Sequence, residues 1–182
     1  MTAEIRTERL LMRRWRDEDR APFAAMNGDP TVMRYYPRTM TPEESDAFVD
    51  RIEAAFDEHG YGLWAVELDG EFTGYVGLGW HVFEEGGPEE LEVGWRLAER
   101  FWGKGIATEA GLAALAVGLD REPTVVSVTA EVNEPSQRVM QRIGMRLHSR
   151  FEHIRVELGS PLRPHVRYAA NRQTWMPHSV LA

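Results

Sequence analysis

The stretch Glu92-Val-Gly-Trp-Arg-Leu-Ala-Glu-Arg-Phe-Trp-Gly-Lys-Gly-Ile-Ala-Thr-Glu-Ala110 decides how this chain folds. Apolar and polar residues alternate over 91–97, which predicts a strand. The Ala- and Leu-rich segment that follows predicts a helix over 106–118. A glycine-bearing loop at 100–105 joins the two elements. The unpaired N–H groups and the dipole of a helix N-terminus therefore follow directly on a buried strand, an arrangement that attracts anions.

The loop itself carries features suited to a phosphate. Gly103 and Gly105 allow the backbone to turn tightly and to approach an oxygen atom closely. Arg100 and Lys104 add positive charge, and Thr108 adds a hydroxyl group. The spacing is neither that of a Walker loop nor Gly-x-Gly-x-x-Gly. Spacing alone leaves two interpretations open, a phosphate-binding loop and a plain glycine-rich turn.

The segments on either side predict a mixed α/β sheet. Asp17 and Thr41 are expected to cap the first two helices, and Asp69-Gly70 predicts a hairpin turn. The unit at 91–130 is expected to form the one parallel crossover. Further strands are expected at 8–16, 62–68, 72–82, 124–130, 145–158 and 165–175, and further helices at 18–27, between Thr41 and Gly60, and at 133–143.

Composition restricts the class of protein. The chain has 182 residues and no linker or repeat, so one domain over 1–182 is expected. The absence of Cys excludes disulfides, a thiol nucleophile and a Cys-based zinc site. A net charge of −8 argues against nucleic acid as partner, and no apolar stretch approaches the ~20 residues of a membrane span. A cytoplasmic protein is expected, in which Lys104 is the only Lys.

Two motifs give the chain a family resemblance. Arg100-x-x-Gly103-x-Gly105 resembles the Gln/Arg-x-x-Gly-x-Gly/Ala signature of the GNAT acyl-CoA-dependent N-acyltransferases. The wider run from Glu92 to Ala110 is similar to the RimJ/RimL branch, the relatives of the ribosomal-protein N-terminal acetyltransferases. The second motif of that branch appears as Asn133-x-x-Ser136 followed by Gly144-Met145. Because the opening Thr7-Glu-Arg-Leu and the closing His165 to Trp175 also match, the resemblance covers nearly the whole chain.

The resemblance implies the GNAT fold, a mixed and mostly antiparallel sheet splayed between the strands near 91–97 and 124–130, flanked by about four helices. It also implies acetyl-CoA as the acyl donor, with the pyrophosphate on backbone N–H groups from Arg100 to Ala107 and the pantetheine arm in the splay. Lys104 is expected to contact the coenzyme phosphates. The residues expected to bind coenzyme A are Val93, Trp95, Leu97, Arg100, Trp102, Gly103, Lys104, Gly105, Ile106, Ala107, Thr108, Asn133 and Ser136.

Direct attack of an amine on a thioester needs a base, an oxyanion donor and an acid for the thiolate. Glu92 is the candidate base, unless it is only a solvated strand-end carboxylate, and His81 is the alternative base unless it is structural. A backbone N–H within Val93–Trp95 would hold the oxyanion. Many GNAT enzymes carry a Tyr acid where this chain has Met140, so Ser136 is the candidate acid, unless it serves only helix capping. No metal is expected.

The acceptor is expected to be a protein or peptide N-terminus or a small amine, near Tyr36, Arg38, His81 and Glu92. Carboxylates at 84–92 could steer a cationic amine or simply be solvated, whereas Arg38 could select a carboxylate on the acceptor. A homodimer is an open alternative. Two rival functions also stay open, a non-catalytic acyl-CoA-binding or sensor domain and a glycine-loop nucleotide-binding module.

Overall fold

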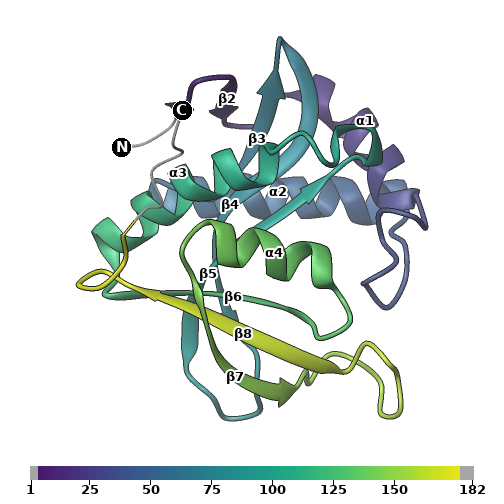
Figure 1. The fold of residues 1–182 in the computed structure, drawn as a ribbon. Coiled ribbons are helices and arrows are strands. Elements are labelled where there is room, and N and C mark those ends of the chain that lie inside the picture. Colours follow the sequence, from purple (N-terminus) through teal and green to yellow (C-terminus); the bar gives the residue numbers. More distant parts are fainter. Residues whose placement is uncertain (1–3, 177–182) are drawn as a thin grey trace.

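The computed structural model describes residues 4–176, so the ends of the expected domain, 1–3 and 177–182, lie outside the described residues. The chain alternates between one sheet and helices that cover it (Figure 1). The strands are β1 (Glu4–Arg6), β2 (Leu10–Arg13), β3 (Leu63–Leu68), β4 (Glu71–Val82), β5 (Glu89–Leu97), β6 (Thr124–Ala130), β7 (Arg146–Glu152) and β8 (Pro164–Asn171). The helices are α1 (Asp17–Gly28), α2 (Pro42–His59), the short 3-10 turn Glu99–Phe101, α3 (Ile106–Arg121) and α4 (Glu134–Arg142).

The sheet has eight strands in the order β1-β2-β3-β4-β5-β6-β8-β7. Only β5 and β6 run parallel, and every other neighbouring pair is antiparallel. The predicted mixed, mostly antiparallel sheet with one parallel crossover is therefore confirmed. Helices α3 and α4 cover one face of this sheet, and α1 and α2 lie behind it (Figure 1).

Strands β5 and β6 are paired at a single position and diverge beyond it. Its register holds the single pair Glu92↔Val126. On its other side β5 pairs with β4 along nine residues, from Gly74↔Leu97 to Val82↔Glu89. Past Glu92 the N–H and C=O groups of β5 that face β6 therefore lack a ladder partner, which confirms the predicted splay and leaves backbone groups available to a ligand.

Local sequence accounts for several boundaries. Thr41 Oγ1 accepts a hydrogen bond from Glu44 N at 3.2 Å, and the Glu44 carboxylate accepts one from Thr41 N at 2.9 Å, so a capping box starts α2. Asp69 and Gly70, in the predicted hairpin turn, have φ values of 53° and 80°, the positive values that a type I′ turn requires. At α1 the N-cap residue is Arg16 rather than Asp17, because the Asp19 carboxylate closes the first turn by accepting from Arg16 N at 2.8 Å.

Three predicted strands are shorter in the structure. The strand expected at 8–16 is limited to β2 because the chain turns into α1, and β1 at its edge was not predicted. The strand expected at 145–158 ends at Glu152, and the one expected at 165–175 ends at Asn171. Beyond Glu152 the chain forms turns, closed by the hydrogen bond from His153 N to Arg163 O at 3.0 Å.

Apolar side chains fill both sides of the sheet. On the α1 and α2 side, the ring of Phe23 packs edge-on against Tyr75 with centroids 6.0 Å apart. On the α3 side, Gly118 allows close packing, since a Cβ there would lie 2.9 Å from Val125. Within residues 4–176 no helix combines the length and the apolar character that crossing a membrane requires.

Candidate active site

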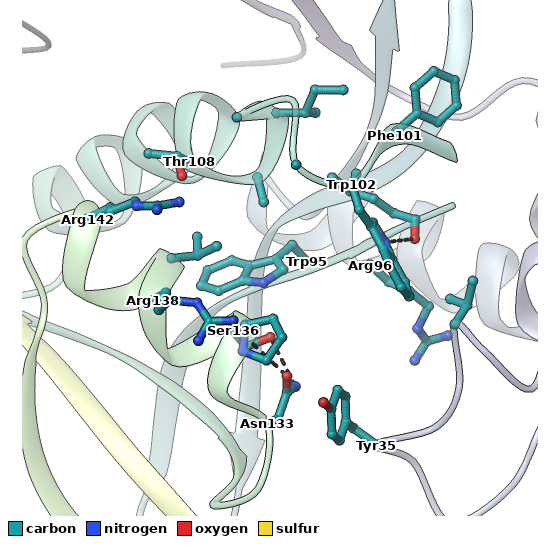
Figure 2. A pocket seen from close by; sticks show the side chains of 18 of the residues that line it. Tyr35, Trp95, Arg96, Phe101, Trp102, Thr108, Asn133, Ser136, Arg138 and Arg142 are labelled. Carbon is teal, nitrogen blue, oxygen red and sulfur yellow. Dashed lines mark hydrogen bonds between the residues drawn. The ribbon is translucent and has the colours of Figure 1, made fainter. Parts of the chain in front are cut away.

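A pocket of about 400 Å³ opens where β5 leaves β6, between the N-terminal ends of α3 and α4 (Figure 2). Figure 2 shows the indole of Trp95 between Thr108 of α3 and Arg138 of α4. Ten of the residues expected to bind coenzyme A line this pocket. They are Trp95, Leu97, Trp102, Gly103, Gly105, Ile106, Ala107, Thr108, Asn133 and Ser136.

The loop between β5 and α3 forms the anion-binding end of this pocket. Gly103 and Gly105 have φ values of 73° and 77°, in the left-handed region that favours glycine. Gly105 is the N-cap of α3, and no side chain caps this helix. The first N–H groups of α3 therefore have no intrahelical partner, and their residues, Ile106 to Thr108, line the pocket. This end of the pocket suits a phosphate group.

A clamp from the N-terminal segment holds the loop in place. The Glu109 carboxylate accepts hydrogen bonds from Thr7 Oγ1 at 2.5 Å and from Arg9 N at 2.9 Å. Its second oxygen accepts from Arg9 Nε at 2.7 Å, and Arg9 Nη1 donates to Lys104 O at 3.1 Å. The segment that begins at Thr7 thus fixes both the first turn of α3 and the backbone of the glycine loop.

Three of the expected coenzyme residues do not line the pocket. The Arg100 guanidinium forms an exposed ion pair with Glu71 at 2.7 Å. The Lys104 ammonium lies 5.3 Å from the centroid of the Phe101 ring. Val93 is fully buried in the core. The side chains of Arg100 and Lys104 therefore stand apart from the pocket, although their loop forms its rim.

Four arginines that were not expected to bind coenzyme A line the pocket, and two of them, Arg138 and Arg142, come from α4. Figure 2 shows Arg142 extending from α4 into the space between Trp95 and Thr108, and Arg138 on the opposite side of Trp95, beside Ser136. The signal was present in the sequence, because these arginines lie four residues apart on the helix that follows Asn133, and residues four apart share one helix face. Charge from α4 thus faces the free N–H groups of α3 across the pocket.

Asn133 and Ser136 form a connected pair at the start of α4. Asn133 Oδ1 accepts a hydrogen bond from Ser136 N at 3.3 Å and so caps the helix. Asn133 Nδ2 donates to Thr129 Oγ1 at 2.8 Å and to Ser136 Oγ at 3.0 Å. Because Ser136 Oγ serves as an acceptor toward Asn133, its own hydroxyl proton stays available for donation into the pocket.

A second pocket, also of about 400 Å³, adjoins the first and contains three of the expected acceptor-site residues, Tyr36, His81 and Glu92. The two pockets share part of their lining. The residues that line both are Tyr35, Tyr36, Trp95, Arg96, Asn133 and Ser136. Ser136 therefore faces both spaces, and Glu92 faces only the second.

Glu92 and His81 lie side by side in the second pocket. Glu92 Oε2 is 3.5 Å from His81 Nε2, and Glu92 Oε1 accepts a hydrogen bond from Val128 N at 3.2 Å. Burial raises the pKa of Glu92 to about 7, partly offset by the Val128 hydrogen bond. Burial, together with the nearby Arg155, lowers the pKa of His81. Glu92 can thus exchange a proton near neutral pH, beside an uncharged imidazole.

Some charges near the expected acceptor site are already paired. Arg38 lines neither pocket, since its guanidinium binds the Glu44 carboxylate at 2.6 Å. In the acidic loop, Glu84 and Glu90 both contact Arg167, at 2.8 Å and 3.0 Å. One guanidinium therefore engages both carboxylates, which are not directed at a ligand. Among residues 4–176 no cluster of three or more His, Asp or Glu side chains is arranged to hold a metal ion.

Residues 9–146 match the acetyltransferase (GNAT) domain family. The uncharacterized N-acetyltransferase YnaD of Bacillus subtilis (strain 168) is 30% identical over 153 residues, which cover 81% of this chain and 85% of the relative. A crystal structure of a GNAT-family acetyltransferase from Bacillus anthracis is similar with a TM-score of 0.75 and 28% identity, over 93% of this chain and 99% of that one.

A RimL ribosomal L7/L12 α-N-protein acetyltransferase, solved in complex with coenzyme A, shares the fold at lower identity. Its TM-score is 0.73 at 17% identity, over 92% of this chain and 97% of that chain. The family match spans both the glycine loop of residues 100–105 and the Asn133–Ser136 pair, which line the same pocket. The chain therefore belongs to the GNAT family of acetyltransferases.

Proposed function

We propose that this protein transfers an acetyl group from acetyl-CoA to a primary amine by direct attack. The observation that carries the proposal is that two neighbouring pockets share lining residues. The pocket with the anion-binding loop and the pocket with Glu92 meet at Trp95 and Ser136. Two substrates could therefore be held with their reactive groups together, which is the main requirement of direct transfer.

The residues of the first pocket suit coenzyme A. The free N–H groups at the start of α3 would hold the pyrophosphate, and Arg138 and Arg142 would add charge for the phosphates. The unpaired edge of β5 would hydrogen-bond the amides of the pantetheine arm, in the manner of an added strand. When bound, acetyl-CoA supplies the activated acetyl group.

Glu92 is proposed as the base that takes a proton from the acceptor ammonium. Its raised pKa, about 7, makes the carboxylate a more effective proton acceptor than an exposed Glu would be. His81, 3.5 Å away, is proposed to orient this carboxylate and to pass its proton toward solvent. Gly79 leaves space for this imidazole, since a Cβ there would lie 2.9 Å from His81 Nε2.

The oxyanion donor and the acid are proposed to lie where the two pockets share lining residues. A backbone N–H within Val93–Trp95, on the unpaired edge of β5, is proposed to stabilise the oxyanion. As the new C–N bond forms and the C–S bond breaks, Ser136 would give its hydroxyl proton to the departing thiolate. The nitrogen loses two protons in all: the first, from the ammonium, passes to Glu92 and on to solvent, and the second, lost as the C–N bond forms, restores the Ser136 hydroxyl. The products are the amide, the thiol of coenzyme A and one proton, so the transfer needs no further reactant.

Incubation with acetyl-CoA and a panel of amines, followed by release of free thiol, tests the proposal. Release that depends on protein and on any one amine would support it and would exclude a sensor domain. Tight acetyl-CoA binding without thiol release across a panel of peptides, polyamines and amino acids would favour the sensor. Preferential binding of ATP over acetyl-CoA would contradict both coenzyme interpretations.

A further inference from the structure

Arg96 is a buried cation without a counter-charge. Its relative exposure is 8%, and its partners among residues 4–176 are Asn27, Met40 and two tyrosines, none of which is a carboxylate. Nη1 donates to Asn27 Oδ1 at 2.6 Å, but the buried Nε has no hydrogen-bond partner among the described residues. A buried guanidinium with an unsatisfied donor is costly unless a ligand completes its bonds.

The fold holds this guanidinium firmly at the junction of the two pockets. Its Cζ lies 4.2 Å from the ring centroid of Tyr36 and 5.5 Å from that of Tyr75. These rings stabilise a cation but supply no carboxylate. Arg96 lines both pockets together with Tyr36. The position is therefore built for a charge, and the missing partner would be an anion within one of the pockets.

The side chain of Arg96 lies on the same face of β5 as Glu92, the candidate base. Side chains alternate along a strand, so Glu92, Gly94 and Arg96 share one face. Glu92 lines only the second pocket, and a Cβ built on Gly94 would meet nothing nearer than Glu92 Cδ at 4.0 Å. Because Gly94 has no side chain, open space lies between the candidate base Glu92 and the guanidinium of Arg96.

We propose that Arg96 binds the carboxylate of the acceptor, so that the acceptor is a small aminocarboxylate such as an amino acid. This inference rests on the proposed function and specifies its substrate class. The amine would lie over Gly94 beside Glu92, and the carboxylate would lie at Arg96. The pocket volume of about 400 Å³ matches a small molecule. Arg38, for which the sequence left the selection of such a carboxylate open, binds Glu44 instead.

The coenzyme is the weaker candidate for this anion. The coenzyme pocket already has Arg138, Arg142 and the N-terminus of α3 for phosphates. The other arginine that lines the acceptor pocket is Arg155, but it is exposed to solvent, which leaves Arg96 as the buried cation of this pocket, on the same strand face as Gly94. Kinetics can distinguish the acceptor from the coenzyme as the partner of Arg96, because the KM of each substrate is measured separately.

The first test compares each amino acid with its carboxamide as acceptor. The wild-type protein should prefer the free carboxylate by at least about tenfold in kcat/KM, the scale of one hydrogen bond to a charged group. Arg96→Met should abolish that preference and raise the acceptor KM, with the KM for acetyl-CoA within twofold. Arg150→Met, an exposed residue paired with Glu131, should retain the preference. Equal use of acid and amide by the wild type would overturn the proposal, as would a raised KM for acetyl-CoA alone.

A second test needs no turnover and so stands apart from the proposed function. Amino acids and their carboxamides are titrated into the wild-type protein while thermal unfolding is followed. Stabilisation by the acid but not by the amide supports the carboxylate site even if no acetyl transfer is found. Because Arg96→Met could fail to fold, Gly94→Val serves as a further variant that fills the pocket floor and should remove the stabilisation. Equal shifts with acid and amide in the wild type, or none with any amino acid, would overturn the proposal.

Discussion

At the scale of single residues, Glu92 stands where the ladder between β5 and β6 ends. One carboxylate oxygen accepts from Val128 N and the other faces His81. The side chain thus bridges the splayed strands as well as facing the acceptor pocket. These two roles can be separated, because a Gln at this position still offers an oxygen to Val128 N but cannot accept a proton from an amine.

Glu92→Gln tests the base. A base works in its deprotonated form, so wild-type kcat/KM should rise with pH through about 7, the raised pKa of Glu92. The variant should lose that rise, and kcat should fall by about 10²-fold or more. Rates measured from pH 5.5 to 9 at saturating acetyl-CoA check both expectations. Glu89→Gln, an exposed residue on the same strand, is the control, and near-wild-type turnover of Glu92→Gln would remove Glu92 from this role.

Ser136→Ala tests the acid. The hydroxyl proton is free because Asn133 Nδ2 donates to Ser136 Oγ. Its removal should lower kcat by about tenfold, within the usual range for a lost proton donor, with the KM for acetyl-CoA within twofold. Steady-state kinetics with both substrates varied make the measurement. Unchanged turnover would show that the thiolate departs without a protein acid.

At the scale of elements, the glycine loop depends on an anchor far away in the sequence. Glu109 on α3 binds Thr7 and Arg9, and Arg9 in turn binds the carbonyl of Lys104. Glu109→Ala should therefore loosen the loop and raise the KM for acetyl-CoA. A several-fold increase is expected, because hydrogen bonds to a charged group contribute about 1.5–3 kcal/mol and only part of this reaches the coenzyme site. The comparison is Glu99→Ala, exposed on the 3-10 turn. An unchanged KM in Glu109→Ala would contradict the anchoring role.

A buried ion cluster joins α1 to the sheet. Arg13 of β2 donates to Asp19 of α1 at 2.7 Å and to Glu67 of β3 at 2.5 Å, and all three side chains are at most 10% exposed. Arg13→Met would leave the buried Asp19 carboxylate without a guanidinium partner and Glu67 with only Arg16, at 3.2 Å. The free energy of unfolding should fall by about 3–5 kcal/mol. Urea unfolding checks this against Arg150→Met, and a loss below 1 kcal/mol would contradict the role of the cluster.

Sequence and structure agree where the signal is local. The capping box at Thr41, the Asp69-Gly70 turn and the crossover through α3 all follow from short patterns. The role of a given arginine is not local. Arg38 and Arg96 look alike in a chain whose cations are nearly all Arg, yet one forms an exposed pair with Glu44 and the other is buried between tyrosines. Burial and partners depend on packing between distant elements, which spacing does not encode.

At the scale of the whole molecule, the sheet is two parts joined at Glu92↔Val126 and covered by α3 and α4. A ligand in the splay would contact both parts and should stabilise them together. At 100 times its Kd, acetyl-CoA should add about 2.7 kcal/mol to the free energy of unfolding and raise Tm by several degrees. Calorimetry with and without acetyl-CoA measures this, with ATP as control. The absence of a shift at millimolar acetyl-CoA would contradict the coenzyme site.

The central claim is that two substrates meet at the junction lined by Trp95 and Ser136 and react directly. Initial rates of thiol release, measured while acetyl-CoA and the best amine are both varied, test it most directly. Direct transfer requires both substrates to be bound at once, which predicts intersecting double-reciprocal lines and no thiol release without amine. Parallel lines, with a burst of thiol before amine is added, would reveal an acetylated protein intermediate and contradict the claim.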